Sequence, residues 1–347
     1  MSVRILQGDC RDVLKTLPDE SMHCVVTSPP YWGLRDYGVA GQIGLDSSPQ
    51  EFIGSLVGVF REARRVLRSD GTLWLNLGDC YNSIGHKKSN SGYGSTGLAG
   101  GKAQEQTPLK KENTDAQLKH KDLCLIPVRV AMALQADGWW LRSRISWCKP
   151  NGMPESVTDR PTVATEEVFL LTKSERYFYD SEAVRMPPAE ASIARWAQYV
   201  EGQDGSQRAN GGAKTNGPMK AVGGPRRSDK QRGHSRRHNG FNDRWDAMHV
   251  GEQMARGSNL RNWWVIPTEG YEEAHFAVMP SALARICILA GCPAGGTVLD
   301  PFGGAGTTAL VADRHGRDAI SIELNPEYSA LQKRRIVGDS PLFAEVA

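Results

Sequence analysis

The feature that most limits the fold is a glycine-rich turn between an apolar segment and a helix. The stretch Asp300-Pro-Phe-Gly-Gly-Ala-Gly-Thr-Thr308 follows the apolar residues 297–300. Its glycines let the backbone approach a ligand closely, and the helix start offers free N–H groups. Glu323 ends the next apolar segment, about 20 positions on, where an acid can accept both ribose hydroxyls. The pattern favours an α/β fold with a nucleoside-type ligand, a dinucleotide or S-adenosylmethionine, over a turn that only packs a helix on a sheet.

A second motif, Thr27-Ser-Pro-Pro-Tyr-Trp32, comes directly after the apolar residues 23–27. The two prolines fix the backbone and remove two N–H donors, so the tip presents acceptors, namely the Ser28 hydroxyl and the Pro29 carbonyl. An amino group held by two acceptors turns its nitrogen lone pair toward an electrophile, and the ring of Tyr31 can stack on the base that carries it. An ordinary Pro-Pro turn is the alternative interpretation of this motif taken alone.

A third and weaker signal is Gly8-Asp9, at the end of the first apolar segment, residues 3–7. Taken alone, Asp9 is best interpreted as a turn acid. Beside the other two motifs, it becomes a candidate partner for the adenine amino group of a nucleoside cofactor or for a nearby N–H group.

Positive charge is concentrated in the middle of the chain. The formal net charge is only +3, yet residues 205–244 hold ten Lys/Arg against two acids, Asp229 and Asp243. A solvated charged surface is the usual interpretation of such a run. A run this one-sided in a nearly neutral chain more often faces phosphate, so we expect the basic segment to contact nucleic acid.

Length and composition bound the class of protein. The 347 residues suffice for one large domain with an insertion or for two domains. The sequence contains no run of about 18 apolar residues, so no membrane helix is predicted. The N-terminus also lacks the apolar core of a signal peptide, and we therefore expect a cytoplasmic location. Seven cysteines without a C-x-x-C pair predict free thiols and no metal site. Residues 82–121 have no apolar period and predict a long, mobile loop.

Together, the motifs make the chain similar to the bacterial DNA amino-methyltransferases. Ser28-Pro-Pro-Tyr31 resembles their catalytic motif, usually (Asp/Asn/Ser)-Pro-Pro-(Tyr/Phe/Trp), and Asp300-Pro-Phe-x-Gly-x-Gly-Thr307 resembles their cofactor motif. The catalytic motif comes first, an order typical of the circularly permuted β subclass, which places its target-recognition region between the two halves. The stretches 147–156 and 275–280 also look like blocks of this family.

The resemblance implies a fold and a division of the chain. The fold is that of the S-adenosylmethionine-dependent methyltransferases: α/β, with a seven-stranded, mostly parallel sheet, helices on both faces, circular permutation and an inserted target-recognition region. The implied catalytic half is 1–183, the basic target-recognition region 184–264 and the cofactor-binding half 265–347. The strands that end at Ser28 and Asp300 should be neighbours whose carboxyl ends share one cleft.

The resemblance also implies roles for individual residues. Ser28, Pro29, Pro30 and Tyr31 would hold the target base. Within the cofactor site, Glu323 would hold the ribose, Asp9 would lie near the adenine, and the glycine-rich turn would line the methionine part. The residues matched to the S-adenosylmethionine site are Asp9, His275, Phe276, Asp300, Pro301, Phe302, Gly304, Gly306, Thr307 and Glu323.

The implied reaction is direct, in-line transfer of a methyl group to the exocyclic amino nitrogen of a base flipped out of duplex DNA. Acceptors at Ser28 and Pro29 favour the tetrahedral nitrogen of the transition state over the planar ground state. Adenine N6 is the expected target, because the uninterrupted block 27–38 looks like solitary permuted enzymes, many of which modify adenine. Cytosine N4 stays open, since Ser at the first motif position has been associated with cytosine enzymes.

Other classes of protein fit less of the sequence. A cytosine ring-carbon methyltransferase needs a Cys nucleophile, usually after proline, and the chain has no Pro-Cys dipeptide. RNA and protein amino-methyltransferases, which stay open, usually keep the cofactor motif first and lack a basic insertion at this place. An inactive DNA-binding relative would have lost one of the two motifs, and both are intact. A nicotinamide dehydrogenase would leave Ser28–Tyr31 unused.

The expected partner is double-stranded DNA. Arg35 follows the catalytic motif closely enough to approach a flipped nucleotide, although a surface arginine is as good an interpretation. A homodimer is expected from the family alone, and the sequence indicates neither a cognate endonuclease nor the residues that read bases. The candidate phosphate contacts in the basic segment are Arg226, Arg227, Arg236 and Arg237.

Overall fold

The chain divides into two compact units. The computed structural model describes residues 2–34, 36–82, 118–190, 252, 256–270, 278–339 and 345–346. The first unit comprises 1–180 with 261–347, and the second comprises 181–260. The first unit contains the sheet and both sequence motifs, so it is the part of the molecule that positions the site.

The first unit is built on one sheet, which has nine strands within the described residues, in the order β6-β4-β5-β3-β2-β7-β8-β1-β9. Only the pairs of β5 with β3 and with β4 are antiparallel, and the other six pairs are parallel. Seven strands form the expected mostly parallel sheet, and the short β6 and β9 extend it at its two edges. The strands are β1 (Ser2–Gln7), β2 (Met22–Thr27), β3 (Leu67–Leu77), β4 (Trp140–Cys148), β5 (Thr165–Thr172), β6 (Trp263–Val265), β7 (Thr297–Asp300), β8 (Asp318–Glu323) and β9 (Glu345–Val346).

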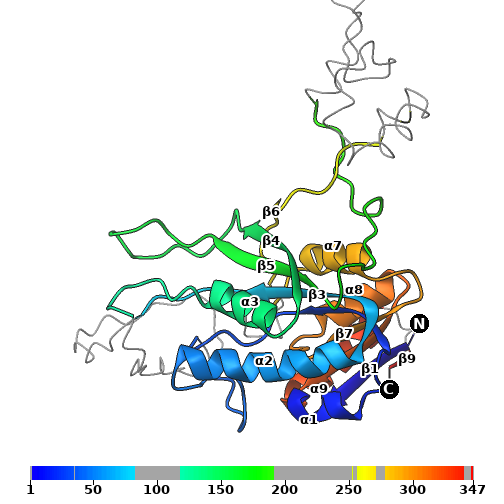
Figure 1. The fold of residues 1–347 in the computed structure, drawn as a ribbon, viewed down its shortest axis with the longest axis horizontal. Coiled ribbons are helices and arrows are strands. Elements are labelled where there is room, and N and C mark those ends of the chain that lie inside the picture. Colours follow the sequence, from blue (N-terminus) through cyan, green and yellow to red (C-terminus); the bar gives the residue numbers. More distant parts are fainter. Residues whose placement is uncertain are drawn as a thin grey trace, which may run out of the picture. The chain divides into compact units, whose positions relative to one another are not determined.

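Helices cover both faces of the sheet (Figure 1), which confirms the expected fold class. On one face, α2 and α3 share a large apolar core with β3 and β5. On the other face, α7 packs against β2 and β3, and α8 packs against β7 and β8. The helices are α1 (Cys10–Val13), the 3-10 turn η1 (Leu14–Thr16), α2 (Pro49–Val66), α3 (Ile126–Ala136), α7 (Ser281–Gly291), α8 (Thr307–Arg314) and α9 (Pro326–Asp339).

The long helix α2 shows how local sequence builds this core. Ser48 accepts a hydrogen bond from the N–H group of Glu51, and Pro49 occupies the first turn, both of which favour a helix start. Apolar residues at three- and four-residue spacing then face the sheet, and Phe52 and Leu56 have no exposed surface. Each such side chain contributes roughly 1.5–3 kcal/mol by leaving water.

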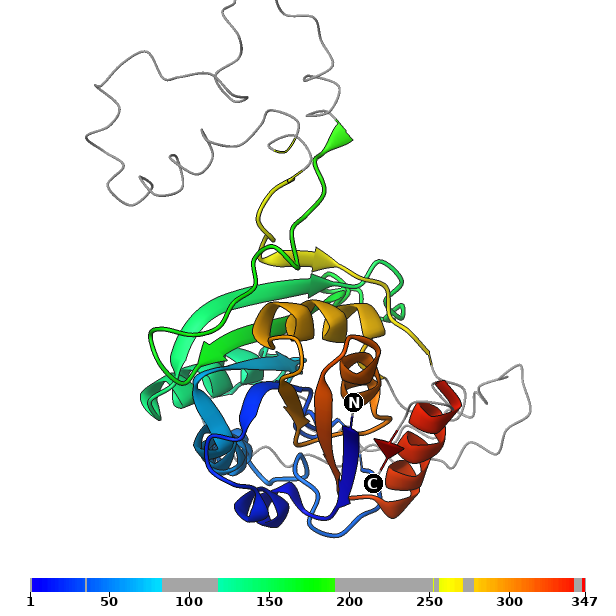
Figure 2. The ribbon, with the colours of Figure 1, turned by 90° about the vertical axis from the view of Figure 1, so that its right-hand side faces the viewer.

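The strand pairing brings distant parts of the chain together. In β2, Cys24 and Val25 pair with Val298 and Leu299 of β7 in parallel. The two strands that lead into the motifs are therefore neighbours, and their carboxyl ends lie at the same edge of the sheet, as the family resemblance implied. At one lateral edge, β1 pairs with β9, so the first and last described strands lie side by side (Figure 2).

The limits of the inserted region differ slightly from those expected. Residues 263–265, of which the first two were assigned to the basic region, form β6 and pair with Ser146–Cys148 of β4. They belong to the sheet because Trp264 is buried against it and its ring centroid lies 6.3 Å from that of Trp74.

The second unit is described only at its base, where two segments of chain meet. Met186 and Ser258 form an antiparallel bridge. Arg185 donates from its guanidinium to the carbonyls of Arg256 and Gly257, at 2.7 and 3.1 Å. Gly257 has φ +69°, and a Cβ atom there would lie 2.0 Å from the Met186 carbonyl oxygen, so this position requires glycine.

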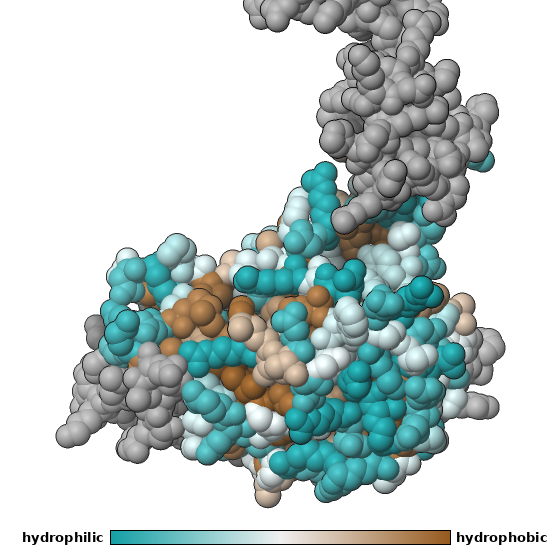
Figure 3. All heavy atoms as spheres, in the orientation of Figure 1, coloured by the Kyte–Doolittle hydropathy of each residue, from teal (hydrophilic) through white to brown (hydrophobic). Residues whose placement is uncertain are grey.

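The face seen in Figure 3 is mixed in polarity, with groups of apolar residues among hydrophilic ones. Within these residues, no helix has the length and apolar character needed to cross a bilayer.

Gly291 is the position where the packing of α7 on the sheet can be tested. A Cβ atom there would lie 2.3 Å from Trp74 Nε1 and 2.4 Å from Thr72 Oγ1. We expect Gly291→Ala to lower the free energy of unfolding by about 1–3 kcal/mol through overpacking, measured by urea denaturation. Gly58→Ala is the matched control, because Gly58 lies on α2 with open space around it; it should raise stability by about 0.5–1 kcal/mol. A neutral Gly291→Ala would contradict the packing described here.

Candidate active site

A cavity of about 820 Å³ opens at the carboxyl ends of β2, β7 and β8. Of the candidate catalytic and cofactor-binding residues that the structure describes, all but Gly306 line it. The two motifs, which are far apart in the sequence, therefore face one space. Candidates that lie outside the described residues are Arg35, Arg226, Arg227, Arg236, Arg237, His275 and Phe276.

A buried hydrogen bond links the two motif strands directly. Thr27 Oγ1 donates to Asp300 Oδ1 at 2.6 Å, and the same oxygen accepts the N–H group of Phe302 at 3.0 Å. Burial raises the pKa of Asp300, against the opposing effect of the hydrogen bonds from Thr27, Thr308 and the Phe302 backbone. Although Asp300 borders the cavity, its carboxyl group is engaged by the protein, so it fixes the position of the glycine-rich turn.

The glycine-rich turn depends on backbone shapes that glycine tolerates. Gly304 and Gly306 have φ values of +51° and +76°, in the left-handed region that disfavours other residues. Glu323, at the end of β8, accepts the N–H group of Gly304 through Oε2 at 2.7 Å and that of Asn325 through Oε1 at 2.8 Å. Burial raises the pKa of Glu323. The turn and the predicted ribose-binding acid thus form one rigid unit.

Helix α9 supports the turn from behind. A Cβ atom on Gly306 would lie 2.9 Å from the side chain of Gln332. Thr307 Oγ1 is 2.9 Å from Arg335 Nη1, which donates to it. The hydroxyl of Thr307, expected beside the methionine part of the cofactor, is therefore held by the protein, and Gly306 acts in packing.

The chemistry of the cavity fits S-adenosylmethionine. The carboxylate of Glu323 can accept hydrogen bonds from the ribose hydroxyls while it keeps those from the backbone, because each oxygen has more than one lone pair. Helix α8 begins at the cavity with no side chain capping its first turn, and free N–H groups there suit a carboxylate such as that of the methionine part. These residues would bind the two ends of one molecule.

Asp9 borders the same cavity and is paired with Arg11. Its Oδ1 accepts from Arg11 Nε at 2.9 Å and also from the Arg11 backbone N–H group, which caps α1. The side-chain hydrogen bond from Arg11 lowers the pKa of Asp9. Arg11 also donates to the Gly41 carbonyl at 2.8 Å, so Asp9 and Arg11 together fix the loop that borders the expected adenine end.

The catalytic motif follows β2 and presents Ser28 and Pro29 to the cavity. The ring of Tyr31 lies against Gly78, where a Cβ atom would be 2.5 Å from the ring. Its hydroxyl donates to Glu166 Oε2 at 2.5 Å. Burial is the main cause that raises the pKa of Tyr31, so the phenol stays neutral. The ring therefore packs closely against Gly78, and the hydroxyl serves a polar contact that sequence reasoning did not foresee.

Three residues that the sequence did not single out complete this site. Asn76, on β3, donates to Tyr31 Oη at 2.9 Å and to Glu166 Oε2 at 2.8 Å. Lys149, just after β4, forms an ion pair with Glu166 Oε1. The available signal was Asn76 itself, a polar residue within the apolar run Leu73–Leu77, since polar residues at core positions often mark functional sites.

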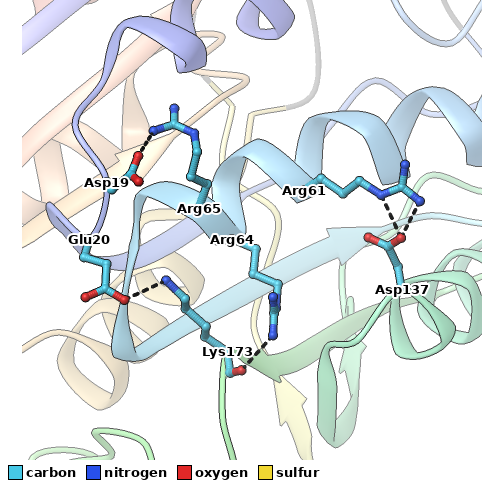
Figure 4. Close-up of a pocket in the computed structure, with 7 residues that line it drawn as sticks. All are labelled: Asp19, Glu20, Arg61, Arg64, Arg65, Asp137 and Lys173. Atoms are coloured by element: carbon cyan, nitrogen blue, oxygen red, sulfur yellow. Dashed lines mark hydrogen bonds and ion pairs between the residues drawn. The ribbon is translucent and has the colours of Figure 1, made fainter.

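A second hollow, of about 720 Å³, is lined by charged side chains from α2 and from the segments around it (Figure 4). Its charged groups bind one another: Arg61 pairs with Asp137 and Lys173 pairs with Glu20. Arg64 donates to the carbonyl of Lys173 at 3.3 Å. These contacts join α2 to the ends of α3 and β5, and the end of β5 to the residue Glu20 before β2. The charged groups thus have partners within the protein, and exposed pairs of this kind contribute little stability, so we assign the hollow no ligand.

Comparison with known proteins agrees with this geometry. The family model described as a DNA methylase, N6_N4_Mtase, matches residues 22–334. The type II methyltransferase M.SmaI of Serratia marcescens is 40% identical over 336 residues, which cover 97% of this chain and 91% of that protein. The type II methyltransferase M.Cfr9I of Citrobacter freundii is 40% identical over 343 residues, covering 99% and 90%.

Among solved structures, the cytosine-N4-specific PvuII DNA methyltransferase has a TM-score of 0.58 at 19% identity, covering 96% of this chain and 86% of that chain. TTHA0409 of Thermus thermophilus, solved in complex with S-adenosylmethionine, has a TM-score of 0.53 at 22% identity, and all of both chains is covered. These likenesses confirm the methyltransferase fold. The chain belongs to the N6/N4 DNA methylase family, and it is an S-adenosylmethionine-dependent DNA methyltransferase.

The buried carboxyl of Asp300 gives a prediction about pH. Its folded pKa is raised above the ordinary value of 3.8, so its contribution to stability is fully present below that value and is lost as pH rises through the folded pKa. Asp300→Asn cannot titrate. We therefore expect the stability of the variant relative to the wild type to increase from about pH 4 to about pH 8, measured by urea denaturation. The control is Asp70→Asn, whose carboxyl is exposed; an equal trend there would contradict the assignment to Asp300.

Glu323 gives a prediction about cofactor binding. Glu323→Gln removes the charge that would hold the ribose, and losing a charge-assisted hydrogen bond costs about 1.5–3 kcal/mol. We expect the Kd for S-adenosylmethionine, measured by calorimetry, to rise roughly 10- to 100-fold. Glu327→Gln, an exposed change in the first turn of α9, should leave the Kd unaltered. Unchanged binding in the Glu323 variant would remove this residue from the cofactor site.

Proposed function

We propose that the enzyme methylates the exocyclic amino nitrogen of a base flipped out of duplex DNA into the cavity at the ends of β2 and β7. The observation that carries the proposal is that Ser28 and Pro29 share one cavity with the glycine-rich turn and Glu323. Its volume of about 820 Å³ is within the ordinary range for ligand sites. A base that enters from one side would meet a cofactor held by the other motif.

Each group would then have a defined task. The cofactor supplies an activated methyl group on a sulfonium. Ser28 Oγ and the Pro29 carbonyl would accept hydrogen bonds from the two N–H groups of the amino nitrogen, which favours a tetrahedral nitrogen and directs its lone pair to the methyl carbon. Phe302 and Gly304 would line the methionine part, Glu323 would hold the ribose, and orientation would supply much of the rate enhancement.

Cytosine N4 is the target that we favour. The first motif position carries the neutral hydroxyl of Ser28 rather than a carboxylate, a feature associated with cytosine enzymes. The similarity in fold to an enzyme described as cytosine-N4-specific accords with this choice. Adenine N6, which the resemblance of block 27–38 favoured, is the second candidate, because the acceptors at Ser28 and Pro29 suit either amino group.

The expected DNA contacts lie outside the described residues and stay predictions. They are the basic segment with Arg226, Arg227, Arg236 and Arg237, and Arg35 beside the catalytic motif. Three further points also stay predictions: that the DNA substrate is a duplex, that the enzyme is a homodimer and that it is cytoplasmic. Two relatives carry the name type II methyltransferase, so a cognate endonuclease is a partner worth seeking.

The proposal predicts the chemical product. Incubation with labelled S-adenosylmethionine and mixed-sequence duplex DNA, followed by digestion and mass analysis, should yield N4-methylcytidine in its deoxy form. N6-methyldeoxyadenosine would support the second candidate. Ser28→Ala should lower the rate by about 100-fold or more with little change in cofactor affinity. Label in RNA or protein but not in DNA would overturn the proposal, and a fully active Ser28→Ala would remove Ser28 from the site.

A further inference from the structure

Two hydroxyl groups, those of Ser28 and Tyr31, connect the cavity to a partly buried ion pair between Glu166 and Lys149. Ser28 Oγ donates to Tyr31 Oη at 3.4 Å, and Tyr31 Oη donates to Glu166 Oε2 at 2.5 Å. The other carboxylate oxygen of Glu166 pairs with Lys149. The hydroxyl that faces the substrate side of the cavity is thus connected to a carboxylate by two hydrogen bonds.

Asn76 holds this line in place. Its amide nitrogen lies 2.9 Å from Tyr31 Oη, 2.8 Å from Glu166 Oε2 and 3.4 Å from Ser28 Oγ. As a donor to the two acceptor oxygens, it directs the Tyr31 proton to Glu166 and leaves the Tyr31 lone pairs to accept the proton of Ser28. The side chain of Asn76 is 3% exposed, so packing fixes its position.

The environment of Tyr31 favours a neutral phenol that passes a proton on over a phenolate anion. Burial raises the pKa of Tyr31 and keeps it neutral, so Tyr31 can pass a proton on without becoming an anion. Three side chains contact Glu166: Lys149 just after β4, Tyr31 in the motif loop and the neutral Asn76 on β3. Tyr37 is a further titratable group close to Tyr31. The side chains of Glu166 and Lys149 are only 13% and 20% exposed.

The reaction requires a proton acceptor. When the amino nitrogen forms its bond to the methyl carbon, the carbon–sulfur bond breaks and its electron pair stays on sulfur. The nitrogen then carries a positive charge, and it must lose one proton to give the neutral methylamino product. Water must be kept from the lone pair during transfer, so an internal acceptor is favourable.

We propose that Glu166 takes up this proton, acting through Tyr31 and Ser28. The amino nitrogen gives its proton to Ser28 Oγ, Ser28 gives its own proton to Tyr31 Oη, and Tyr31 gives its proton to Glu166 Oε2. Glu166 ends as a neutral acid and returns the proton to water, while Ser28 and Tyr31 end unchanged. Glu166 is thus a positioning residue that acts through the motif, and the inference rests on the proposed function of Ser28.

The other acids that line the cavity have partners that do not include Ser28 or Tyr31. Asp79 accepts the N–H groups of Cys80 and Ile126, and Glu269 and Glu323 accept those of Ser281 and Gly304. Asp9 and Glu155 pair with Arg11 and Arg160, and Asp300 accepts from Thr27. Glu166, by contrast, lines the cavity and accepts a hydrogen bond from a side chain of the catalytic motif itself.

The test compares Glu166→Gln with a neighbour on the same strand. Glu166→Gln cannot take the proton, so the single-turnover rate should fall about 100-fold, whereas the cofactor Kd and the unfolding temperature should stay near the wild-type values. The wild-type rate should decrease toward acid pH, and the variant should lack this decrease. Glu166→Asp should restore part of the rate. Glu167→Gln is the matched control, because Glu167 pairs with Arg144 away from the motif.

Tyr31→Phe gives a second, independent measurement. It removes the central hydroxyl, and the double variant Tyr31→Phe/Glu166→Gln should be no slower than either single variant, since both interrupt one path. A Glu166→Gln enzyme with the wild-type rate at every pH would overturn the inference, as would multiplicative losses in the double variant. If Ser28→Ala is inactive while Glu166→Gln is fully active, only this inference fails; if Ser28→Ala is also active, the proposed function of the motif fails with it.

Discussion

The hydrogen bond between Thr27 and Asp300 joins two strands whose residues are 273 positions apart in the chain. It lies in the interior, where a low dielectric strengthens such a contact and makes its loss costly. Because the catalytic motif and the glycine-rich turn begin directly after these two residues, the bond sets the relative position of both. A shift of β2 against β7 by one residue would turn every side chain of the strand to the opposite face, and the two halves of the site would no longer meet.

The sequence was sufficient to predict the parts of the molecule that depend on local chemistry. The glycine-rich turn, the Pro-Pro tip and the apolar strands before them each carry their signal within a few residues. The resemblance of these motifs to the DNA amino-methyltransferases then implied the fold class and the pairing of β2 with β7, and the structure confirms both. The bounds of the elements depend less on local signals. Helix α3 begins at Ile126, because Leu125 adopts a left-handed backbone with φ +56°. Residues 68–71 include an Asp-Gly pair, which is common in turns, yet they belong to β3.

The polar network beyond the motif could not be predicted, because it is assembled from three strands and a loop. Asn76, Lys149 and Glu166 are neighbours only once β3, β4 and β5 pair in their observed register. In the sequence, Glu166 stands beside Glu167, and nothing local distinguishes the acid that contacts Tyr31 from the one that pairs with Arg144. Tyr31 illustrates the same limit. Its motif predicts an aromatic face for a base, whereas its hydroxyl contact with Glu166 depends on residues more than a hundred positions away.

The base of the second unit has a consequence for how this enzyme can change over time. The bridge between Met186 and Ser258, held by Arg185 and the glycine at 257, closes the chain on itself before it returns to the sheet. Once such a ring is closed, doubling the number of residues within it costs only about 0.6 kcal/mol of chain entropy. A change in the number of residues between Met186 and Ser258 therefore costs little chain entropy as long as the bridge and Gly257 are kept, and the sheet need not change with it.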